Sequence, residues 1–475
     1  MKIMEKKTTF GLIVGTRGFF NPALAVEARK QLLTRLDALG YSYVIPAEDA
    51  TPNGAIETLA DAKLCADVFK QHAEEIDGIV VVLPNFGDEL AVVNTLAMAK
   101  LDVPVLVQAC DDDLDKLSIS QRRDSWCGKL SVCNNLYQYG IPFTNTSRHT
   151  CSIESDIFAY DLERFSRVCR VVKGLTNLRV GAIGARPAAF QTMRFSEKLL
   201  QETGITVVPV DFSEIMFAAM ALDDGAAEVK AKMDEIYAYG TIPPSIHVEN
   251  ILKQAKLSVT VERWMAENEC EASGIQCWTS VEQNYGCATC LTMSMMGEKF
   301  MPSACEVDVA GVVAMYALQL ASGQPAALQD WNNNYGDDED KCINVHCSNY
   351  PKSFIGKEEI EISNLDVLGL SLGFDRCFGA VKAQVAAGPM TFFRMSTDDS
   401  QGLIKAYVGE GEFTDDPCTI DGGSSVCKVE GMQDLMDFIC KNGFEHHVAL
   451  TRTHCADVLE EAISTYLDWD LYRHE

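Results

Sequence analysis

Ile79-Val-Val-Val-Leu83, stopped by Pro84-Asn-Phe-Gly87, is the stretch that decides the fold of the first third of this 475-residue chain. A continuous apolar run that ends at a turn signal is typical of a strand buried on both faces, as in a parallel sheet. Similar short runs stand at 10–14, 41–46 and 103–108, and helical patterns separate them, at about 22–39, 60–76 and 89–100. The alternation predicts a doubly wound α/β domain, in which functional residues lie on loops after the strand C-termini.

The same alternation restarts near residue 178. A strand is predicted over 178–183, a turn at 184–187, a helix continuing to about Thr203, and a strand over 205–210. After Pro351 the chain shows β-rich pieces with many Gly and Asp turns, which indicates an antiparallel domain closed by a helix near 456–467. We therefore predict two doubly wound parallel-sheet domains, residues 1–172 and 173–345, followed by a β-rich C-terminal domain, residues 346–475.

The charge balance excludes several classes of partner. The chain carries 40 Lys and Arg against 68 Asp and Glu, a net charge of −28, whereas nucleic acids and anionic membranes require a basic surface. No apolar run is long enough for a transmembrane helix, and the start of the sequence lacks the pattern of a signal peptide. Despite its 18 cysteines, we expect a cytoplasmic protein with reduced thiols.

Two carboxylates stand in segments that should be buried: Glu306 in Ser-Ala-Cys-Glu-Val-Asp-Val, and Asp330 in Leu-Gln-Asp-Trp. Burying a carboxylate is costly unless a cation, hydrogen bonds or a raised pKa compensates it. Either residue alone is better explained as a helix cap or loop border. Together with the later pair His446-His447, they predict one oxygen-rich metal site with an imidazole ligand.

Mixed oxygen and nitrogen ligation favours Mn²⁺, with Mg²⁺ or Co²⁺ as alternatives. Such an ion could hold two oxygens of an open-chain sugar and stabilise an enediolate. One carboxylate would then carry a proton between C2 and C1, while the other manages the hydroxyl protons. The predicted activity is aldose–ketose isomerisation.

Three other features allow more than one interpretation. Gly15-Thr-Arg-Gly18 lacks dinucleotide-binding spacing, so Arg17 is either a loop-borne cation for a ligand or a solvated turn residue. Cys287-Ala-Thr-Cys290 has the spacing of zinc and redox sites, but the nearest candidates, Cys277, Cys305, His346 and Cys347, form no second such pair. We interpret these cysteines as incidental. His346 is a packed histidine unless it converges with the carboxylates.

At Ala304-Cys-Glu-Val-Asp308, Leu328-Gln-Asp-Trp331 and Glu445-His-His447, the chain resembles the L-fucose isomerase and L-arabinose isomerase superfamily. Trp278-Thr279 and Gly388-Pro-Met-Thr-Phe-Phe-Arg394 are also similar to that family. The resemblance implies a metal site formed by Glu306, Asp330 and His447, in which the two carboxylates are also the acid/base pair. On this basis the second predicted domain carries the carboxylates and the third carries the histidine ligand.

The resemblance also implies contacts with the substrate and between subunits. Arabinose-type members have one more histidine ligand, which would fall on His346, whereas fucose-type members lack it; we assign His346, His446, Trp278 and Arg17 to substrate binding. Arg17 matches an arginine that reaches into a neighbouring subunit's site, so a homo-oligomer, a trimer or hexamer with active sites at subunit interfaces, is expected.

The implied substrate is a hexose or pentose, including 6-deoxy or C6-modified sugars such as L-fucose or sulfoquinovose. An anionic C6 group would require cations, and the arginine candidates are Arg17, Arg148, Arg186, Arg394 and Arg452. Two rival functions remain open. A metal-dependent aldolase or epimerase would use the same stabilisation of charge, and a non-catalytic sugar-binding protein would share the two α/β domains.

Overall fold

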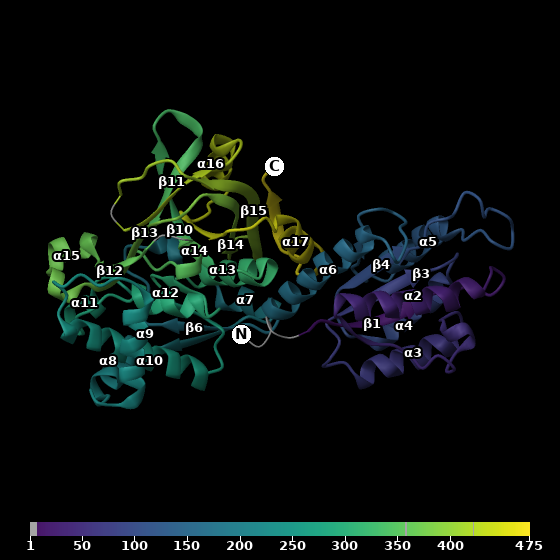
Figure 1. The fold of residues 1–475 in the computed structure, drawn as a ribbon, viewed down its shortest axis with the longest axis horizontal. Helices are drawn as coiled ribbons and strands as arrows, with labels where there is room; N and C mark the ends of the chain where they lie inside the picture. The colour runs from purple at the N-terminus through teal and green to yellow at the C-terminus, as the bar shows by residue number, and fades with distance from the viewer. Residues whose placement is uncertain (1–6, 357–358, 421) are drawn as a thin grey trace. The chain divides into compact units, whose positions relative to one another are not determined.

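The computed structural model describes residues 7–356, 359–420 and 422–475, which form two units (Figure 1). The N-terminal unit comprises Lys2–Lys173 and Glu461–Asp468, and the main unit comprises Gly174–Glu460 and Trp469–Glu475. Of the predicted site residues, Arg17 belongs to the N-terminal unit, and the others belong to the main unit.

A five-stranded parallel sheet in the order β2-β1-β3-β4-β5 forms the centre of the N-terminal unit, as the sequence predicts. Its strands are β1 (Thr9–Val14), β2 (Ser42–Val44), β3 (Gly78–Leu83), β4 (Val105–Ala109) and β5 (Thr144–Asn145). The helices between and after them are α2 (Ala23–Leu39), α3 (Leu59–Gln71), α4 (Glu89–Ala99), α5 (Ser125–Gln138) and α6 (Asp156–Leu175).

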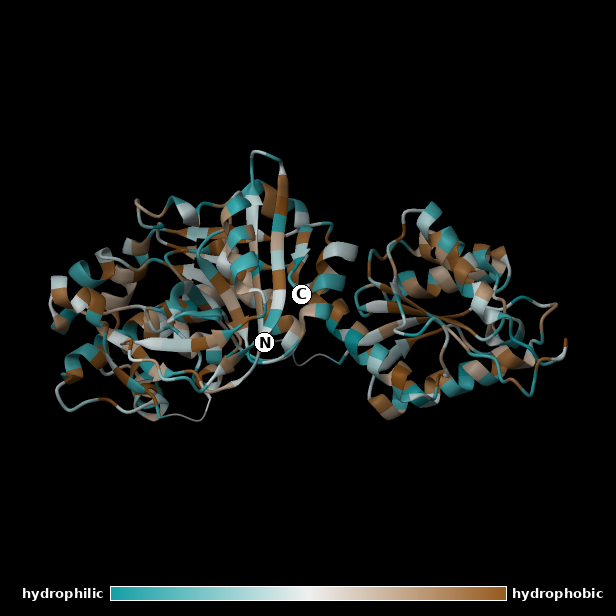
Figure 2. Cartoon of the chain, turned by 90° about the horizontal axis from the view of Figure 1, so that it is seen from above, coloured by the Kyte–Doolittle hydropathy of each residue, from teal (hydrophilic) through white to brown (hydrophobic). Residues whose placement is uncertain are grey.

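Helices cover both faces of this sheet, which explains its unbroken apolar strands. Phe10 and Leu12 of β1 pack with residues of α2 and α6, whereas Ile13 packs with residues of α3, α4 and α5. The hydropathy colouring in Figure 2 shows hydrophobic segments along these strands. All six residues of β3 are buried, so the stretch that decides the fold lies inside this unit.

The main unit begins with a four-stranded parallel sheet in the order β7-β6-β8-β9, the second predicted α/β region. The strands are β6 (Arg179–Ile183), β7 (Thr206–Val210), β8 (Ala272–Ile275) and β9 (Ser303–Cys305). The helices are α7 (Glu197–Thr203), α8 (Phe212–Ala221), α9 (Ala227–Tyr239), α10 (Val248–Glu267), α11 (Ser280–Asn284), α12 (Cys290–Glu298) and α13 (Val309–Ser322).

The predicted helix after residue 187 is wrong in its first part. Only α7, Glu197–Thr203, is a regular α-helix, and the segment before it is a loop with a single short turn at Gln191–Met193. The guanidinium of Arg186 donates hydrogen bonds to the backbone carbonyls of Pro187, Ala188 and Phe190. These bonds satisfy acceptors that a helix would otherwise satisfy, so the loop is stable without helical hydrogen bonds.

Helix α13 is buried along almost its whole length, from Val309 to Ala321. It contacts β6 and β8 of the parallel sheet and also β14 and β17 of a second sheet (Figure 1). A helix that is apolar all round is expected at such a place, between two layers.

The second sheet of the main unit has nine strands in the order β12-β13-β16-β11-β10-β17-β14-β15-β18. Its pairing is antiparallel except for β13 with β16 and β15 with β18, and β15 also pairs with β16, which closes six strands into a ring. The strands are β10 (Ala326–Tyr335), β11 (Asp338–His346), β12 (Glu361–Asn364), β13 (Phe378–Gln384), β14 (Gly388–Asp398), β15 (Leu403–Thr414), β16 (Gly423–Lys428), β17 (His447–Thr451) and β18 (Asp470–Arg473).

The observed sheets confirm the predicted fold class, two parallel α/β regions followed by a β-rich region. The nine-stranded sheet already begins at β10, however, upstream of the predicted third domain at residue 346. Asp330 therefore lies in this sheet rather than in the parallel sheet that precedes Glu306. The three predicted domain ranges stay a prediction.

Short helices complete the C-terminal region: α14 (Lys352–Ile355), α15 (Asp366–Leu372), α16 (Met432–Lys441) and α17 (Ala456–Glu460). The predicted terminal helix is α17, continued by π-helical turns at Glu461–Tyr466. Among the residues that the structure describes, no helix is both long and apolar enough to cross a membrane.

Candidate active site

The strand register of the nine-stranded sheet brings the predicted ligands together. Asp330 in β10 lies opposite His447 in β17 and opposite Val345 in β11, next to His346. Side chains directly opposite each other on antiparallel strands point to the same face and are neighbours. Glu306 reaches the same place from the end of β9, in the turn that leads into α13.

His447 lies between the two carboxylates at this place. Nε2 of His447 lies 3.3 Å from Oδ1 of Asp330 and 3.5 Å from Oε2 of Glu306. Both of these carboxylate oxygens are buried and have no hydrogen-bond partner among the described residues. Buried unpaired oxygens are costly, and a nearby divalent cation would compensate them. The side chains whose ligand atoms lie within 4.8 Å of one another form two groups that share His447, one with Glu306 and His346 and one with Asp330 and His446. Their oxygens and imidazole nitrogens suit an ion such as Mn²⁺, Mg²⁺ or Co²⁺.

A buried carboxylate holds the ring of His447 in place. Nδ1 of His447 donates to Oδ2 of Asp308 at 2.8 Å, so its Nε2 presents a lone pair to the cavity. Asp308 also accepts the backbone N–H of Gly311 and thereby caps the start of α13. This arrangement is the one that commonly orients a histidine metal ligand.

Asp308 keeps its charge through Arg394. Burial opposes ionisation, but the nearby Arg394 guanidinium and the hydrogen bond from His447 hold the pKa of Asp308 well below its usual range. Arg394 is fully buried and lies between Asp308, at 2.6 Å, and Glu445, at 3.1 Å. Ser396 donates a further hydrogen bond to Glu445. Asp308, Arg394 and Glu445 thus form a buried ion network beside His447.

The expectation that Arg394 could meet an anionic sugar group is wrong, because both sides of its guanidinium are occupied by buried carboxylates. Arg186 donates a hydrogen bond to the backbone carbonyl of Pro187, and Arg452 donates to those of Ala386 and Ala387. Arg148 belongs to the N-terminal unit. Sequence position alone could not separate these structural arginines from a ligand-binding one.

Glu306 occupies a tight turn. Its φ is +62° and that of Val307 is +54°, and the N–H of Asp308 donates to the carbonyl of Cys305 to close the turn. Left-handed backbone at two non-glycine residues is unfavourable and persists where the surroundings fix it, often at functional sites. Burial raises the pKa of Glu306 to about 8. A nearby cation would oppose this effect and favour the ionised form.

His346 lies beside the same three groups. Its Nδ1 accepts the backbone N–H of Cys347 at 2.8 Å, so in the neutral ring Nε2 carries the proton. That Nε2 lies 3.3 Å from Nε2 of His447 and 4.0 Å from Oδ1 of Asp330. In this tautomer Nε2 of His346 is a hydrogen-bond donor, whereas with the ring proton moved to Nδ1 it could hold an ion together with Glu306 and His447, whose ligand atoms lie within 4.8 Å of it.

A cavity of about 460 Å³ opens in front of these groups. Glu306, Asp330, His346 and Trp278 line it, together with apolar residues such as Leu365. Its volume is within the range of small-molecule sites. A sugar ring or open chain would fit there.

Two aromatic contacts place further residues beside the cavity. The ring of Phe190 lies 5.1 Å from Trp278 and 6.4 Å from His446, and Nε2 of His446 lies 3.9 Å from Oδ1 of Asp330. Phe190 was missed by sequence reasoning because its segment was assigned to a helix. Pro187 gave no signal against that helix, because it restricts only Arg186 before it and is tolerated in the first turn of a helix.

Arg17 lies in the N-terminal unit, where it donates to Glu89 at 2.6 Å and stacks over the ring of Phe86 at 4.6 Å. It is thus paired and partly enclosed, rather than a freely solvated turn residue. Its role in a neighbouring subunit's site stays a prediction.

One more buried carboxyl was not found from the sequence. Glu282 of α11 is fully enclosed, neither of its oxygens has a hydrogen-bond partner among the described residues, and it is not part of the cavity wall. Burial raises its pKa from 4.5 to about 7. The folded chain therefore keeps a proton that the unfolded chain releases, and stability falls as the pH rises through this window.

Glu282→Gln is expected to raise the free energy of unfolding by about 1–3 kcal/mol near pH 8 and to change it little near pH 5. The amide has nearly the same shape but never ionises. Urea denaturation of both proteins at the two pH values measures the difference. An equal effect at both pH values would show that ionisation of Glu282 is not responsible.

Comparison with known proteins gives matches at both ends of the chain. Residues 11–176 match a family model described as fucose/sulfoquinovose isomerase, N-terminal domain, and residues 344–475 match one described as L-fucose isomerase, C-terminal domain. Glu306 and Asp330 lie between these two ranges, and His447 lies within the second.

Curated proteins similar to the chain include sulfoquinovose isomerases. That of Priestia megaterium (strain ATCC 12872 / QMB1551) is 26% identical over 350 residues, which cover 72% of this chain and 73% of that protein. That of Alkalicoccus urumqiensis is 26% identical over 301 residues, which cover 62% of this chain and 64% of that protein. The similarity therefore extends over most of the chain.

Proposed function

We propose that this chain, which belongs to the fucose isomerase-like superfamily of aldose–ketose isomerases, isomerises an open-chain sugar with one divalent ion held by Glu306, Asp330 and His447. The enzyme is thus an intramolecular oxidoreductase. The observation that supports the metal proposal is the approach of two unpaired buried carboxylate oxygens to Nε2 of His447. When bound, the ion, Mn²⁺ before Mg²⁺ or Co²⁺, would stabilise negative charge developing on the sugar.

The two carboxylates divide the proton transfers. Glu306 takes the proton from C2 of the aldose and returns it to C1, because a bound cation would keep its buried carboxylate ionised and ready to accept a proton. Asp330, whose side chain is 21% exposed, moves protons between the sugar hydroxyls. A buried carboxyl, Glu306, and a partly exposed one, Asp330, suit separate base and acid roles.

The surrounding groups orient the site and the sugar. Asp308 fixes the ring of His447, and Arg394 keeps Asp308 ionised. The Nε2–H of His346 donates a hydrogen bond to a sugar oxygen. Trp278 and His446, with Phe190 beside them, pack against the carbon chain of the sugar.

The substrate proposed first is sulfoquinovose, because curated relatives bear that name, with L-fucose and other hexoses or pentoses as alternatives. Among the described residues that line the cavity, Lys382 is the one lysine or arginine, and it is paired with Asp366. A C6 sulfonate would therefore need a further cation. Arg17 from a neighbouring subunit of a trimer or hexamer is our candidate.

Turnover of a sugar panel tests this function. The protein, stripped of metal, is assayed with sulfoquinovose, L-fucose, L-arabinose and D-arabinose, with and without added Mn²⁺. Manganese-dependent formation of the ketose is expected. Cleavage or epimer products would favour the aldolase or epimerase alternative, and tight sugar binding without turnover would favour a binding protein.

His447→Ala is expected to weaken Mn²⁺ binding by about 100-fold or more, because loss even of an outer partner of a ligand weakens a metal about 10–100-fold. Calorimetric titration of the metal-free protein measures the affinity. His454→Ala is the matched control, because His454 is exposed and contacts Gly411 rather than the site. Equal affinities in the two variants would remove His447 from the ligand set.

A further inference from the structure

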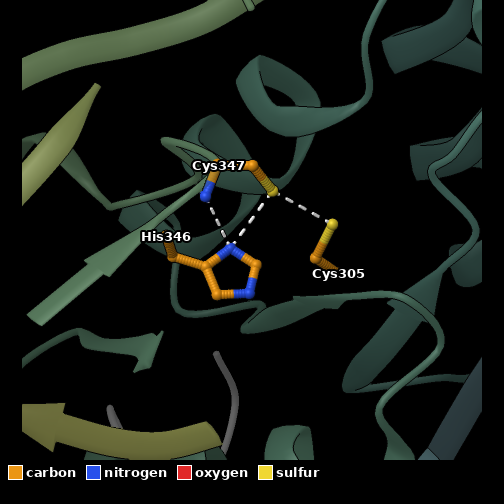
Figure 3. A group of neighbouring side chains, drawn as sticks. All are labelled: Cys305, His346 and Cys347. Atoms are coloured by element: carbon orange, nitrogen blue, oxygen red, sulfur yellow. Dashed lines mark hydrogen bonds between the residues drawn. The ribbon is translucent and has the colours of Figure 1, made fainter. Parts of the chain in front are cut away.

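One cysteine in the wall of the active-site cavity has a second thiol directly beside it. Cys347 is partly exposed, and among the described residues that line the cavity it is the one cysteine. Its Sγ lies 3.2 Å from Sγ of Cys305, a fully buried residue at the end of β9 (Figure 3). An accessible sulfur thus lies next to an enclosed one, although the two residues are 42 positions apart in the chain.

The two sulfurs are separate thiols, but they are close enough to be joined. Both cysteines are free, and their separation exceeds the length of a disulfide bond, about 2.05 Å, by only about 1 Å. Small movements of the two side chains would therefore bring the sulfurs to bonding distance.

A third thiol shows which sulfur an oxidant meets first. Sγ of Cys277 lies 2.7 Å from Sγ of Cys305, and both residues are buried. Neither is among the described residues that line the cavity, whereas Cys347 is. A small oxidant in the cavity therefore reaches the sulfur of Cys347 first, and Cys305 is the thiol that can react with the oxidised sulfur.

We propose that Cys347 and Cys305 form a site of reversible oxidation, in which hydrogen peroxide that enters the cavity joins the two sulfurs in a disulfide. In the first step the Cys347 sulfur takes one oxygen from the peroxide: the O–O bond breaks, an S–O bond forms, and the thiol proton leaves with the other oxygen as water. In the second step the Cys305 sulfur attacks that of Cys347: an S–S bond forms, the S–O bond breaks, and the proton of Cys305 leaves with the hydroxyl as water. Two thiols are thus oxidised, and one peroxide is reduced to two waters.

A second pair of thiols has the same spacing without the access. Cys342 of β11 and Cys427 of β16 are opposite each other on neighbouring strands, and their sulfurs lie 3.3 Å apart. Both residues are buried, and neither is among the described residues that line the cavity. This pair is therefore an internal control that separates access to the oxidant from mere proximity of two thiols.

The sequence did not reveal this site because its two cysteines come from separate strand ends. Cys305 ends β9, and Cys347 directly follows β11. The spacing of Cys287 and Cys290 was the local signal, but both of these residues are buried, and neither is among the described residues of the cavity wall. The interpretation of that pair as incidental stays a prediction.

The disulfide would disturb the active site from two sides, an effect that rests on the proposed function. Cys305 directly precedes Glu306. Cys347 directly follows His346 and contacts its Nδ1 through the sulfur, at 3.1 Å, and through the backbone N–H, at 2.8 Å (Figure 3). Misplacement of a catalytic group by about 1 Å can cost about 100-fold in rate, so the oxidised protein is expected to turn over sugar about 10–100-fold more slowly.

Peptide mapping by mass spectrometry tests the site without any assay of turnover. The reduced protein is treated with hydrogen peroxide, the remaining thiols are alkylated under denaturing conditions, and the chain is digested. A cross-linked peptide that joins Cys305 to Cys347 is expected, and dithiothreitol should remove it. Cys342 and Cys427 should be recovered as alkylated thiols.

Two serine variants test the order of the steps. Cys347→Ser should leave Cys305 reduced after the same treatment, because the sulfur that meets the peroxide is missing. Cys342→Ser, from the control pair, should give the Cys305–Cys347 peptide in unchanged yield. The map of the unmodified protein decides the matter even if the variants do not fold.

Absence of the Cys305–Cys347 peptide from the treated, unmodified protein would overturn the proposal. Oxidation of Cys342 and Cys427 to a disulfide at the same rate would overturn it too, because access to the cavity would then not decide the reaction. A Cys277–Cys305 disulfide formed equally well in Cys347→Ser would show that the oxidant does not act through Cys347. Cross-linked protein that keeps full turnover would contradict the expected effect on the active site.

Discussion

Glu306→Gln is expected to lower turnover by about 10³-fold or more while leaving the fold intact. The amide matches the shape of the carboxyl, but it cannot accept the proton from C2 and is a poor ligand for a divalent ion. Steady-state rates on the sugar identified by the panel, at saturating Mn²⁺, measure the loss. Circular dichroism confirms that the variant is folded.

Glu282→Gln is the matched control for this experiment. Glu282 is an equally enclosed carboxyl of the main unit, and its side chain is not part of the cavity wall. Its variant should turn over sugar at nearly the unmodified rate. If Glu306→Gln also retained that rate, Glu306 would not be the base.

Arg394→Met is expected to reduce the free energy of unfolding by about 3–5 kcal/mol. The substitution keeps most of the side-chain volume but leaves Asp308 and Glu445 buried without their cation. Breaking one side of a buried ion network is much more destabilising than removing an exposed charge. Chemical denaturation, followed by a probe in the main unit, measures the change.

Arg452→Met provides the comparison. Arg452 belongs to the same unit but donates only to the carbonyls of Ala386 and Ala387. Its replacement leaves no carboxylate unpaired, so a clearly smaller loss is expected. Equal losses in the two variants would mean that the ion network of Arg394 contributes little to stability.

Local sequence pattern was sufficient for the parallel sheets. The run at 79–83 is apolar because helices cover both faces of β3, and this information is present in the residues themselves. The recognition of the superfamily from short motifs was likewise confirmed by the matches at both ends of the chain. Glu306, Asp330 and His447 were named from those motifs, and a carboxylate oxygen of each acid lies within 3.5 Å of Nε2 of His447.

Long-range pairing accounts for what the sequence could not reveal. Asp330 shares a sheet with His447 because β10 pairs with β17, more than a hundred residues later in the chain. The contact of Asp308 with Arg394 also depends on tertiary structure. Phe190 was missed for a local reason, because Arg186 satisfies the carbonyls of its loop and no helix forms.

The most direct test of the central claim is the position of deuterium after turnover in deuterated water with Mn²⁺ present. Proton transfer by Glu306 predicts deuterium at C1 of the ketose and at C2 of the recovered aldose, and no label with Glu306→Gln. Ketose formed without any deuterium at these carbons would contradict the account, because the hydrogen would then move without passing through an exchangeable carboxyl.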